Sequence, residues 1–268
     1  MLKKVLFSVV ALLVIIIYPL CNLIAISSNK TPPSENVSEG LSVVESLGEV
    51  SVEKADKAVK AAEDKRTYVL DKPAANTIVE KQIKQIEKGK LSYRKVFSRV
   101  YIAGDSLMEG LEAYGILNSS HLFTKVSASL YHLEEVMPKL ISIKPPVLIL
   151  HYGLNMIGDQ QYHVDSFINQ YTKDLKTLKK KLPDTRIIVS LLFPVDTSVA
   201  TAKRFKYVSR YNKRLIGMCK ELKVEYLDSS PVFKGHNEFY GADGIHLSAA
   251  FYSKYWLKYI MKEMEIYA

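Results

Sequence analysis

Short apolar runs alternate with amphipathic stretches along the second half of the chain. Val100–Ala103 and Val147–His151 consist mostly of apolar side chains, as strands buried on both faces do. Tyr162–Leu182 instead repeats its apolar residues with the period of a helix. Regular alternation of this kind predicts a parallel sheet whose strands are joined by right-handed helical crossovers.

The other predicted elements follow from the same pattern. Further strands are expected at residues 123–126, 186–193 and 224–227, which gives five strands in all. Further helices are expected at residues 106–114, 132–141 and 200–222. A last helix, capped by Ser248, runs to about Glu263.

The N-terminus carries a long apolar run, Val5–Ile26, directly after Lys3 and Lys4. The run is long enough to span a bilayer, and the lysines before it favour an N-terminus inside and the rest of the chain outside. We therefore predict a membrane anchor over residues 1–27. A cleaved signal peptide ending at the small-residue site Ala25-Ile26-Ser27 is the alternative. Lipidation of Cys21 is disfavoured, because a leucine precedes it where a small residue is needed.

A polar region separates this anchor from the strand-rich part. Residues 27–48 are rich in Ser, Pro, Asn and Glu, which is typical of a tether. Residues 55–65 and 76–90 have helical composition with few apolar positions. The sequence thus predicts a flexible, partly helical stalk over residues 28–95 and a catalytic domain over residues 96–268.

Gly104-Asp105-Ser106 lies where the first predicted strand of this domain meets a helix. Active sites of open α/β sheets form at this edge, and the N–H groups of a helix N-terminus there can hold an oxyanion. Ser106 is therefore a candidate nucleophile. Taken alone, it is more simply explained as part of a helix cap.

A candidate base lies far downstream, in Asp243-Gly244-Ile245-His246. The Asp243 carboxylate can receive the Nδ1 proton of His246, which leaves Nε2 free to accept the proton of Ser106. Gly153-Leu154-Asn155 follows the central apolar run, so the Asn155 side chain can donate to a developing oxyanion.

Gly104-Asp105-Ser106-Leu107, Gly153-Leu154-Asn155 and Asp243-Gly244-Ile245-His246, in this order, resemble the sequence blocks of the GDSL/SGNH hydrolase family. The resemblance covers about residues 96–268. It implies a flavodoxin-like three-layer α/β/α sandwich with a parallel five-stranded sheet and ester or acyl-transfer chemistry. By position, it implies a triad of Ser106, His246 and Asp243, a turn supported by Gly104, Asp105 and Gly153, and oxyanion donors at Ser106 and Asn155.

The chain departs from the family pattern at two places. The family's second block supplies a glycine N–H to the oxyanion hole, whereas this chain reads Val126-Ser127-Ala128. Ser127 is the expected equivalent, and it is strained if the turn needs a positive φ. Met156 follows Asn155 where the family has Asp, which predicts altered loop packing.

Three functions remain open from the sequence. The favoured one is a membrane-anchored, extracytoplasmic serine esterase that removes small acyl groups from a cell-envelope glycan, with acetyl as the favoured acyl group. The second is an acyltransferase that moves an acyl group onto such a glycan with the same triad. The third is a catalytically silent binding module of the same fold.

Composition further limits the partners, cofactors and folds that this chain can have. The chain has 268 residues, two cysteines, and 37 Lys and Arg against 28 Asp and Glu, a formal net charge of +9. We expect attraction to anionic cell-wall polymers, no nucleic-acid partner, and no metal or other cofactor. A Gly-x-Ser-x-Gly elbow is absent around Ser106, which disfavours the α/β-hydrolase fold. His151 is interpreted as packing beneath the site, and Phe193 and Pro194 either line the pocket or belong to the core.

Overall fold

A parallel sheet of five strands is the centre of the computed structural model, which describes residues 72–200 and 202–268. Its strands lie in the order β2-β1-β3-β4-β5, and each neighbouring pair is parallel. From β1 the chain adds β2 on one side and then β3, β4 and β5 on the other side. This is the flavodoxin-like strand order. The strands are β1 (Val100–Gly104), β2 (Leu122–Thr124), β3 (Val147–His151), β4 (Arg186–Ser190) and β5 (Glu225–Leu227).

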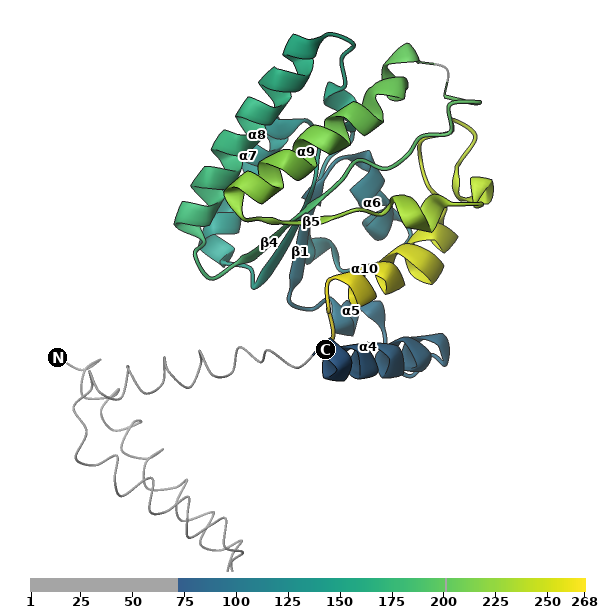
Figure 1. Ribbon diagram of the computed structural model, residues 1–268. Coiled ribbons are helices and arrows are strands. Elements are labelled where there is room, and N and C mark those ends of the chain that lie inside the picture. Colours follow the sequence, from purple (N-terminus) through teal and green to yellow (C-terminus); the bar gives the residue numbers. More distant parts are fainter. Residues whose placement is uncertain (1–71, 201) are drawn as a thin grey trace, which may run out of the picture. The chain divides into compact units, whose positions relative to one another are not determined.

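Helices cover both faces of this sheet (Figure 1). One face carries α7 (Leu130–Ile143), α8 (Gln161–Lys181) and α9 (Val208–Leu222), with α8 packed between the other two. The other face carries α6 (Ser106–Ala113) and the C-terminal helix, which consists of the π-helical segment η6 (Phe251–Trp256) and α10 (Leu257–Glu263). The predicted three-layer α/β/α sandwich with a parallel five-stranded sheet is therefore confirmed.

The remaining helical elements are short or lie outside the sandwich. They are α4 (Lys72–Glu87), α5 (Tyr93–Val96) and the 3-10 turns η1 (Ser119–His121), η2 (Leu154–Met156), η3 (Lys203–Tyr207), η4 (Ser230–Phe233) and η5 (Asn237–Phe239).

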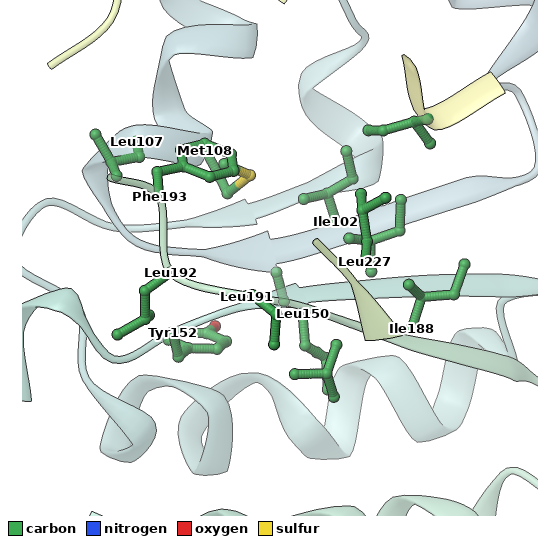
Figure 2. Packing of buried hydrophobic residues seen from close by; sticks show 14 of the residues in the cluster. Ile102, Leu107, Met108, Leu150, Tyr152, Ile188, Leu191, Leu192, Phe193 and Leu227 are labelled. Carbon is green, nitrogen blue, oxygen red and sulfur yellow. The ribbon is translucent and has the colours of Figure 1, made fainter. Parts of the chain in front are cut away.

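The core lies between the sheet and its two helical layers. Figure 2 shows Ile102, Leu150, Ile188 and Leu227, one from each of four strands, at the centre of this packing. All four are at most 1% exposed. In β1, β3 and β4 four of the five residues are buried, so these strands are buried on both faces, as their apolar runs predict. Removal of this apolar area from water is what stabilises the sandwich.

The structure differs from the predicted stalk at its C-terminal end. Val79 and Ile83 of α4 are at most 5% exposed, and α4 packs against α10. Lys258 and Lys262 of the C-terminal helix form ion pairs of 2.6 and 2.7 Å with Glu87 and Glu80 of α4. Leu70–Ala268 forms one compact unit, so the domain begins well before the predicted boundary at residue 95. Ala75, Val79 and Ile83, spaced four residues apart, form the buried face of α4.

Two element boundaries also differ from the prediction. The fourth strand ends at Ser190 rather than at residue 193. The Asn212 side chain there pairs with the backbone N–H and C=O of Leu192 at 2.8 and 2.9 Å, where a neighbouring strand would otherwise bind. The helix expected over residues 200–222 is divided into η3 and α9.

The predicted membrane anchor (1–27) and most of the predicted stalk (28–71) lie outside the described residues. Over residues 72–200 and 202–268, no helix combines the length and the apolar character that a membrane span requires.

Candidate active site

Ser106 is the first residue of α6, directly after β1 and the capping residue Asp105. The Asp105 carboxylate accepts a hydrogen bond of 3.0 Å from the Leu107 N–H, which fixes the start of the helix. A side chain at Gly104 would come within 2.5 Å of Met108 Cγ and 2.9 Å of the His151 carbonyl oxygen. Glycine is therefore required at this tight strand-to-helix turn, which presents Ser106 at the carboxyl edge of the sheet.

The structure brings Ser106, His246 and Asp243 together in series. The His246 Nε2 atom lies 3.0 Å from Ser106 Oγ, and its Nδ1 atom lies 2.6 Å from Asp243 Oδ2. With the proton on Nδ1, the ring donates to the carboxylate and accepts from the serine hydroxyl. Asp243 Oδ1 also accepts from the backbone N–H groups of Ile245 and His246, each at 2.9 Å, so the carboxylate has a fixed orientation.

The pKa values of the two carboxyl groups near Ser106 are shifted in opposite directions. Burial raises the pKa of Asp243, but hydrogen bonds from His246 and from two backbone N–H groups outweigh it and lower this pKa to about 2. Asp243 is therefore ionised throughout the neutral range. Burial raises the pKa of Asp105 to about 7, and within the described residues its Oδ2 atom has no hydrogen-bond partner. The two groups thus differ in charge across the mildly acidic range.

Ser127 lies in a turn that follows β2, closed by a hydrogen bond of 3.1 Å from the Ala128 N–H to the Lys125 carbonyl. Its φ of 57° is in the left-handed region, so the strain predicted for a serine at this position is present. Among the described residues, no acceptor pairs with the Ser127 N–H. This N–H is therefore available to an oxyanion.

Asn155 lies in η2, which begins after Gly153 with its φ of 137°. The Asn155 side chain donates a hydrogen bond of 3.0 Å to the Ala128 carbonyl, and this ties η2 to the turn that contains Ser127. An amide NH₂ has two protons, so the second remains available. Met156 adds a further tie, because its sulfur accepts from the Leu130 N–H at 3.4 Å. The sulfur at this position thus connects η2 to the start of α7.

His151 and Phe193 lie beneath the site and not in it. His151 is completely buried, its Nδ1 atom lies 3.1 Å from Ser190 Oγ, and burial lowers its pKa to about 3. Its ring contacts the ring of Phe193 at a centroid distance of 4.4 Å. Phe193 is 1% exposed, so of its two predicted roles the core role holds.

Sequence reasoning missed two tyrosines that contact the backbone beside Ser106 and His246. The Tyr252 hydroxyl donates to the Leu107 carbonyl, and the Tyr114 hydroxyl donates to the Leu247 carbonyl. Tyrosines are common in amphipathic helices, and neither has a motif around it. The one available signal was Gly110 inside a predicted helix, because an isolated glycine there often marks a place where another segment packs closely against the helix.

The arrangement has the parts that nucleophilic attack on a carbonyl carbon requires. It contains a hydroxyl, an imidazole that can accept its proton, and a carboxylate that stabilises the resulting imidazolium. Among the described residues, the Ser106 and Ser127 N–H groups have no acceptor, and one proton of the Asn155 amide remains beside the one donated to the Ala128 carbonyl, so all three are candidate oxyanion donors. Over the part of the chain that the structure describes, no three His, Cys, Asp or Glu side chains are grouped to hold a metal ion.

Comparisons with known proteins agree with this chemistry. The model of the GDSL-like lipase/acylhydrolase family matches residues 102–254, which contain all three candidate triad residues. No curated protein matches the chain.

Several solved structures resemble this fold. A GDSL-like lipase from Bacteroides thetaiotaomicron is 15% identical, with 69% of this chain and 96% of that chain covered and a TM-score of 0.48. The lipase/acylhydrolase from Enterococcus faecalis is 14% identical, with 62% and 95% covered and a TM-score of 0.48. An acetylxylan esterase from Geobacillus stearothermophilus is 12% identical, with 61% and 92% covered and a TM-score of 0.45.

Proposed function

The chain belongs to the GDSL-like lipase/acylhydrolase family of ester-hydrolysing enzymes, and from this premise we propose that Ser106, His246 and Asp243 form its catalytic triad. We further propose that the enzyme is membrane-anchored and extracytoplasmic, and removes small acyl groups, acetyl in the first place, from a cell-envelope glycan. The observation that carries the proposal is the series of contacts from Ser106 Oγ to His246 Nε2 at 3.0 Å and from His246 Nδ1 to Asp243 Oδ2 at 2.6 Å.

The reaction proceeds in two halves. Ser106 Oγ attacks the ester carbonyl carbon while His246 Nε2 takes the hydroxyl proton, and Asp243 stabilises the imidazolium. Collapse of the tetrahedral intermediate breaks the bond to the sugar oxygen, which receives the proton from His246 and leaves as an alcohol. Water, deprotonated by His246, then attacks the acyl-serine, and the acid and free Ser106 are released.

Oxyanion stabilisation is assigned to three donors. These are the backbone N–H groups of Ser106 and Ser127 and the amide proton of Asn155 that does not bind the Ala128 carbonyl. The first N–H groups of a helix have no partner within the helix, so the Ser106 N–H is free for this purpose. Asn155 also holds the Ser127 turn in place, so it acts both as donor and as brace.

The openness of the site supports a small acyl group on a large substrate. The His246 and Asp243 side chains are 53% and 49% exposed. Val126, inside the Ser127 turn, and Tyr131, just after it, are 63% and 70% exposed. A long acyl chain gains its binding energy from an enclosed apolar slot, whereas an ester that projects from a polymer reaches an open edge.

The proposed location rests on the sequence. The apolar run that follows Lys3 and Lys4 is an anchor that leaves the domain outside the membrane. The formal net charge of +9 favours approach to anionic envelope polymers, which we propose as a partner surface.

The proposal is tested with a glycan that carries radiolabelled acetyl esters. The full chain is expected to release label as free acetate, and Ser106→Ala is expected to release none above the rate without enzyme. Transfer of the label to an added, unacetylated glycan would instead assign the acyltransferase function. Equal release by the wild type and by Ser106→Ala would exclude both functions for this triad.

A further inference from the structure

We propose that Tyr114 and Tyr252 are positioning residues which hold Ser106 and His246 at reacting distance. Each tyrosine comes from the segment of one catalytic residue and binds the backbone next to the other. The inference rests on the proposed roles of Ser106 and His246, and it adds two hydrogen bonds that join their segments.

The first contact runs from the C-terminal helix to the nucleophile. The Tyr252 hydroxyl donates a short hydrogen bond to the carbonyl of Leu107, the residue after Ser106. Tyr252 and Leu107 are both 1% exposed, so water does not compete for this carbonyl. Burial also raises the pKa of the Tyr252 hydroxyl well above its usual value, which keeps the donated proton in place.

The second contact runs in the opposite direction. Tyr114 is the C-cap residue that follows α6, and its hydroxyl donates a hydrogen bond of 3.1 Å to the carbonyl of Leu247, the residue after His246. Leu247 is 3% exposed and belongs to the core. The helix that begins with Ser106 is therefore followed by a capping residue that binds the backbone beside the base.

Close packing between the two segments brings the tyrosine rings together. The ring centroids of Tyr114 and Tyr252 are 6.0 Å apart. A Cβ atom at Gly110 of α6 would lie 2.8 Å from two ring carbons of Tyr252 and 2.8 Å from its hydroxyl oxygen, so only glycine allows this approach. Glycine weakens a helix interior by about 1 kcal/mol relative to alanine, and here the close contact explains its presence.

Tyr252 also lies in the π-helical segment η6, Phe251–Trp256. π-Helical turns are rare, occur mostly as single turns within α-helices, and are frequent at functional sites. In this chain the turn carries the tyrosine whose hydroxyl reaches α6. The backbone of η6 is tied separately to α5, because the Tyr93 hydroxyl donates a hydrogen bond of 2.6 Å to the Ser253 carbonyl.

These contacts matter because Ser106 and His246 are 140 positions apart in sequence and lie in separate segments. Their own hydrogen bond joins side chains at an exposed edge, where it contributes little to holding the segments together. Catalysis is sensitive to such a separation, since a misplacement of about 1 Å can cost on the order of 10²-fold in rate. The buried contact of Tyr252 and the part-buried contact of Tyr114 limit this separation, one from each segment.

The test uses substitutions that remove only the hydroxyl. Tyr252→Phe and Tyr114→Phe keep the rings and their packing, and the rate of hydrolysis of 4-nitrophenyl acetate is measured together with thermal unfolding. We expect kcat to fall about tenfold in each variant while KM stays within about twofold, because positioning acts on the reacting geometry. The double variant is expected to lose less than the product of the single losses, since both contacts set one distance.

Tyr93→Phe is the matched control. It removes a tyrosine hydroxyl that also binds a backbone carbonyl of η6, but next to neither catalytic residue. A lowered melting temperature with unchanged kcat is expected for this variant. Wild-type kcat in Tyr252→Phe and Tyr114→Phe, or an equal loss of kcat in Tyr93→Phe, would overturn the inference. Ser106→Ala, measured in parallel, tests the proposed function separately: full activity there contradicts the triad whatever the tyrosine variants do.

Discussion

Ser127 holds a left-handed backbone conformation, with a φ of 57°, in the turn assigned to the oxyanion. For a residue with a Cβ atom this conformation costs about 1–2 kcal/mol, and glycine avoids the cost but adds about 0.5–1 kcal/mol of chain entropy on folding. Ser127→Gly is therefore expected to raise the free energy of unfolding by about 0.5–1 kcal/mol. Chemical denaturation measures the change, and Ser127→Ala, which keeps the Cβ atom, is expected to bring no gain. A destabilised Ser127→Gly variant would contradict this account of the turn.

Asp105 combines burial with an oxygen that lacks a partner among the described residues. Its pKa rises from 3.8 to about 7 on folding, so the folded state binds the proton more tightly than the unfolded state. The stability that this proton contributes is complete below about pH 4 and is lost as the pH rises to about 7. Asp105→Asn still accepts the Leu107 N–H but does not titrate.

Between pH 4 and pH 7 the wild type is thus expected to lose about 2–4 kcal/mol of unfolding free energy relative to Asp105→Asn. Denaturation at several pH values measures this shift. A difference that is constant with pH would show that Asp105 does not titrate in this range.

At the level of single residues, the sequence indicated which side chains of the motifs would come together. Ser106, Asp243 and His246 were named because triad chemistry requires these residue types, and the structure places them in contact. Tyr114 and Tyr252 could not be found in this way, because the partner of each is a backbone carbonyl. Any residue offers such a carbonyl, so only the folded arrangement identifies the contact.

At the level of elements, α4 belongs to the folded domain and is not part of a flexible tether. Ile83 of α4 is 5% exposed, and burying its side chain stabilises the contact with the C-terminal helix. Ile83→Ala is expected to lower the free energy of unfolding by about 2–5 kcal/mol. Lys81→Ala, at an exposed position of the same helix, serves as the control and is expected to change it by less than about 0.5 kcal/mol. Equal stability of both variants would mean that α4 is not docked in solution.

The order of the strands and helices was predictable from the sequence, whereas several of their ends were not. Continuous apolar runs identified β1 and β3 because buried parallel strands have no polar face. Two residues after β4 ends, the Leu192 backbone is bound by the side chain of Asn212, which comes from α9. The docking of α4 depends on α10, which lies at the other end of the chain. Long-range contacts of this kind leave no local pattern.

At the level of the whole molecule, the domain presents its candidate catalytic edge to solvent. Asp243, with its pKa of about 2, stays ionised at every pH at which such an enzyme works, so the acidic limb of a pH–rate profile does not come from this group. The family match at residues 102–254 includes every block from the nucleophile to the base. The proposed anchor at residues 1–27 remains a prediction from the sequence.

The most direct test of the central claim is to identify the serine that reacts. The protein is treated with a fluorophosphonate, which modifies serines activated by a neighbouring base, and the labelled peptide is identified by mass spectrometry. We expect one modified residue, Ser106, and no modification there after His246→Ala. Modification of a different serine, or equal labelling of Ser106 without His246, would contradict the triad and with it the proposed mechanism.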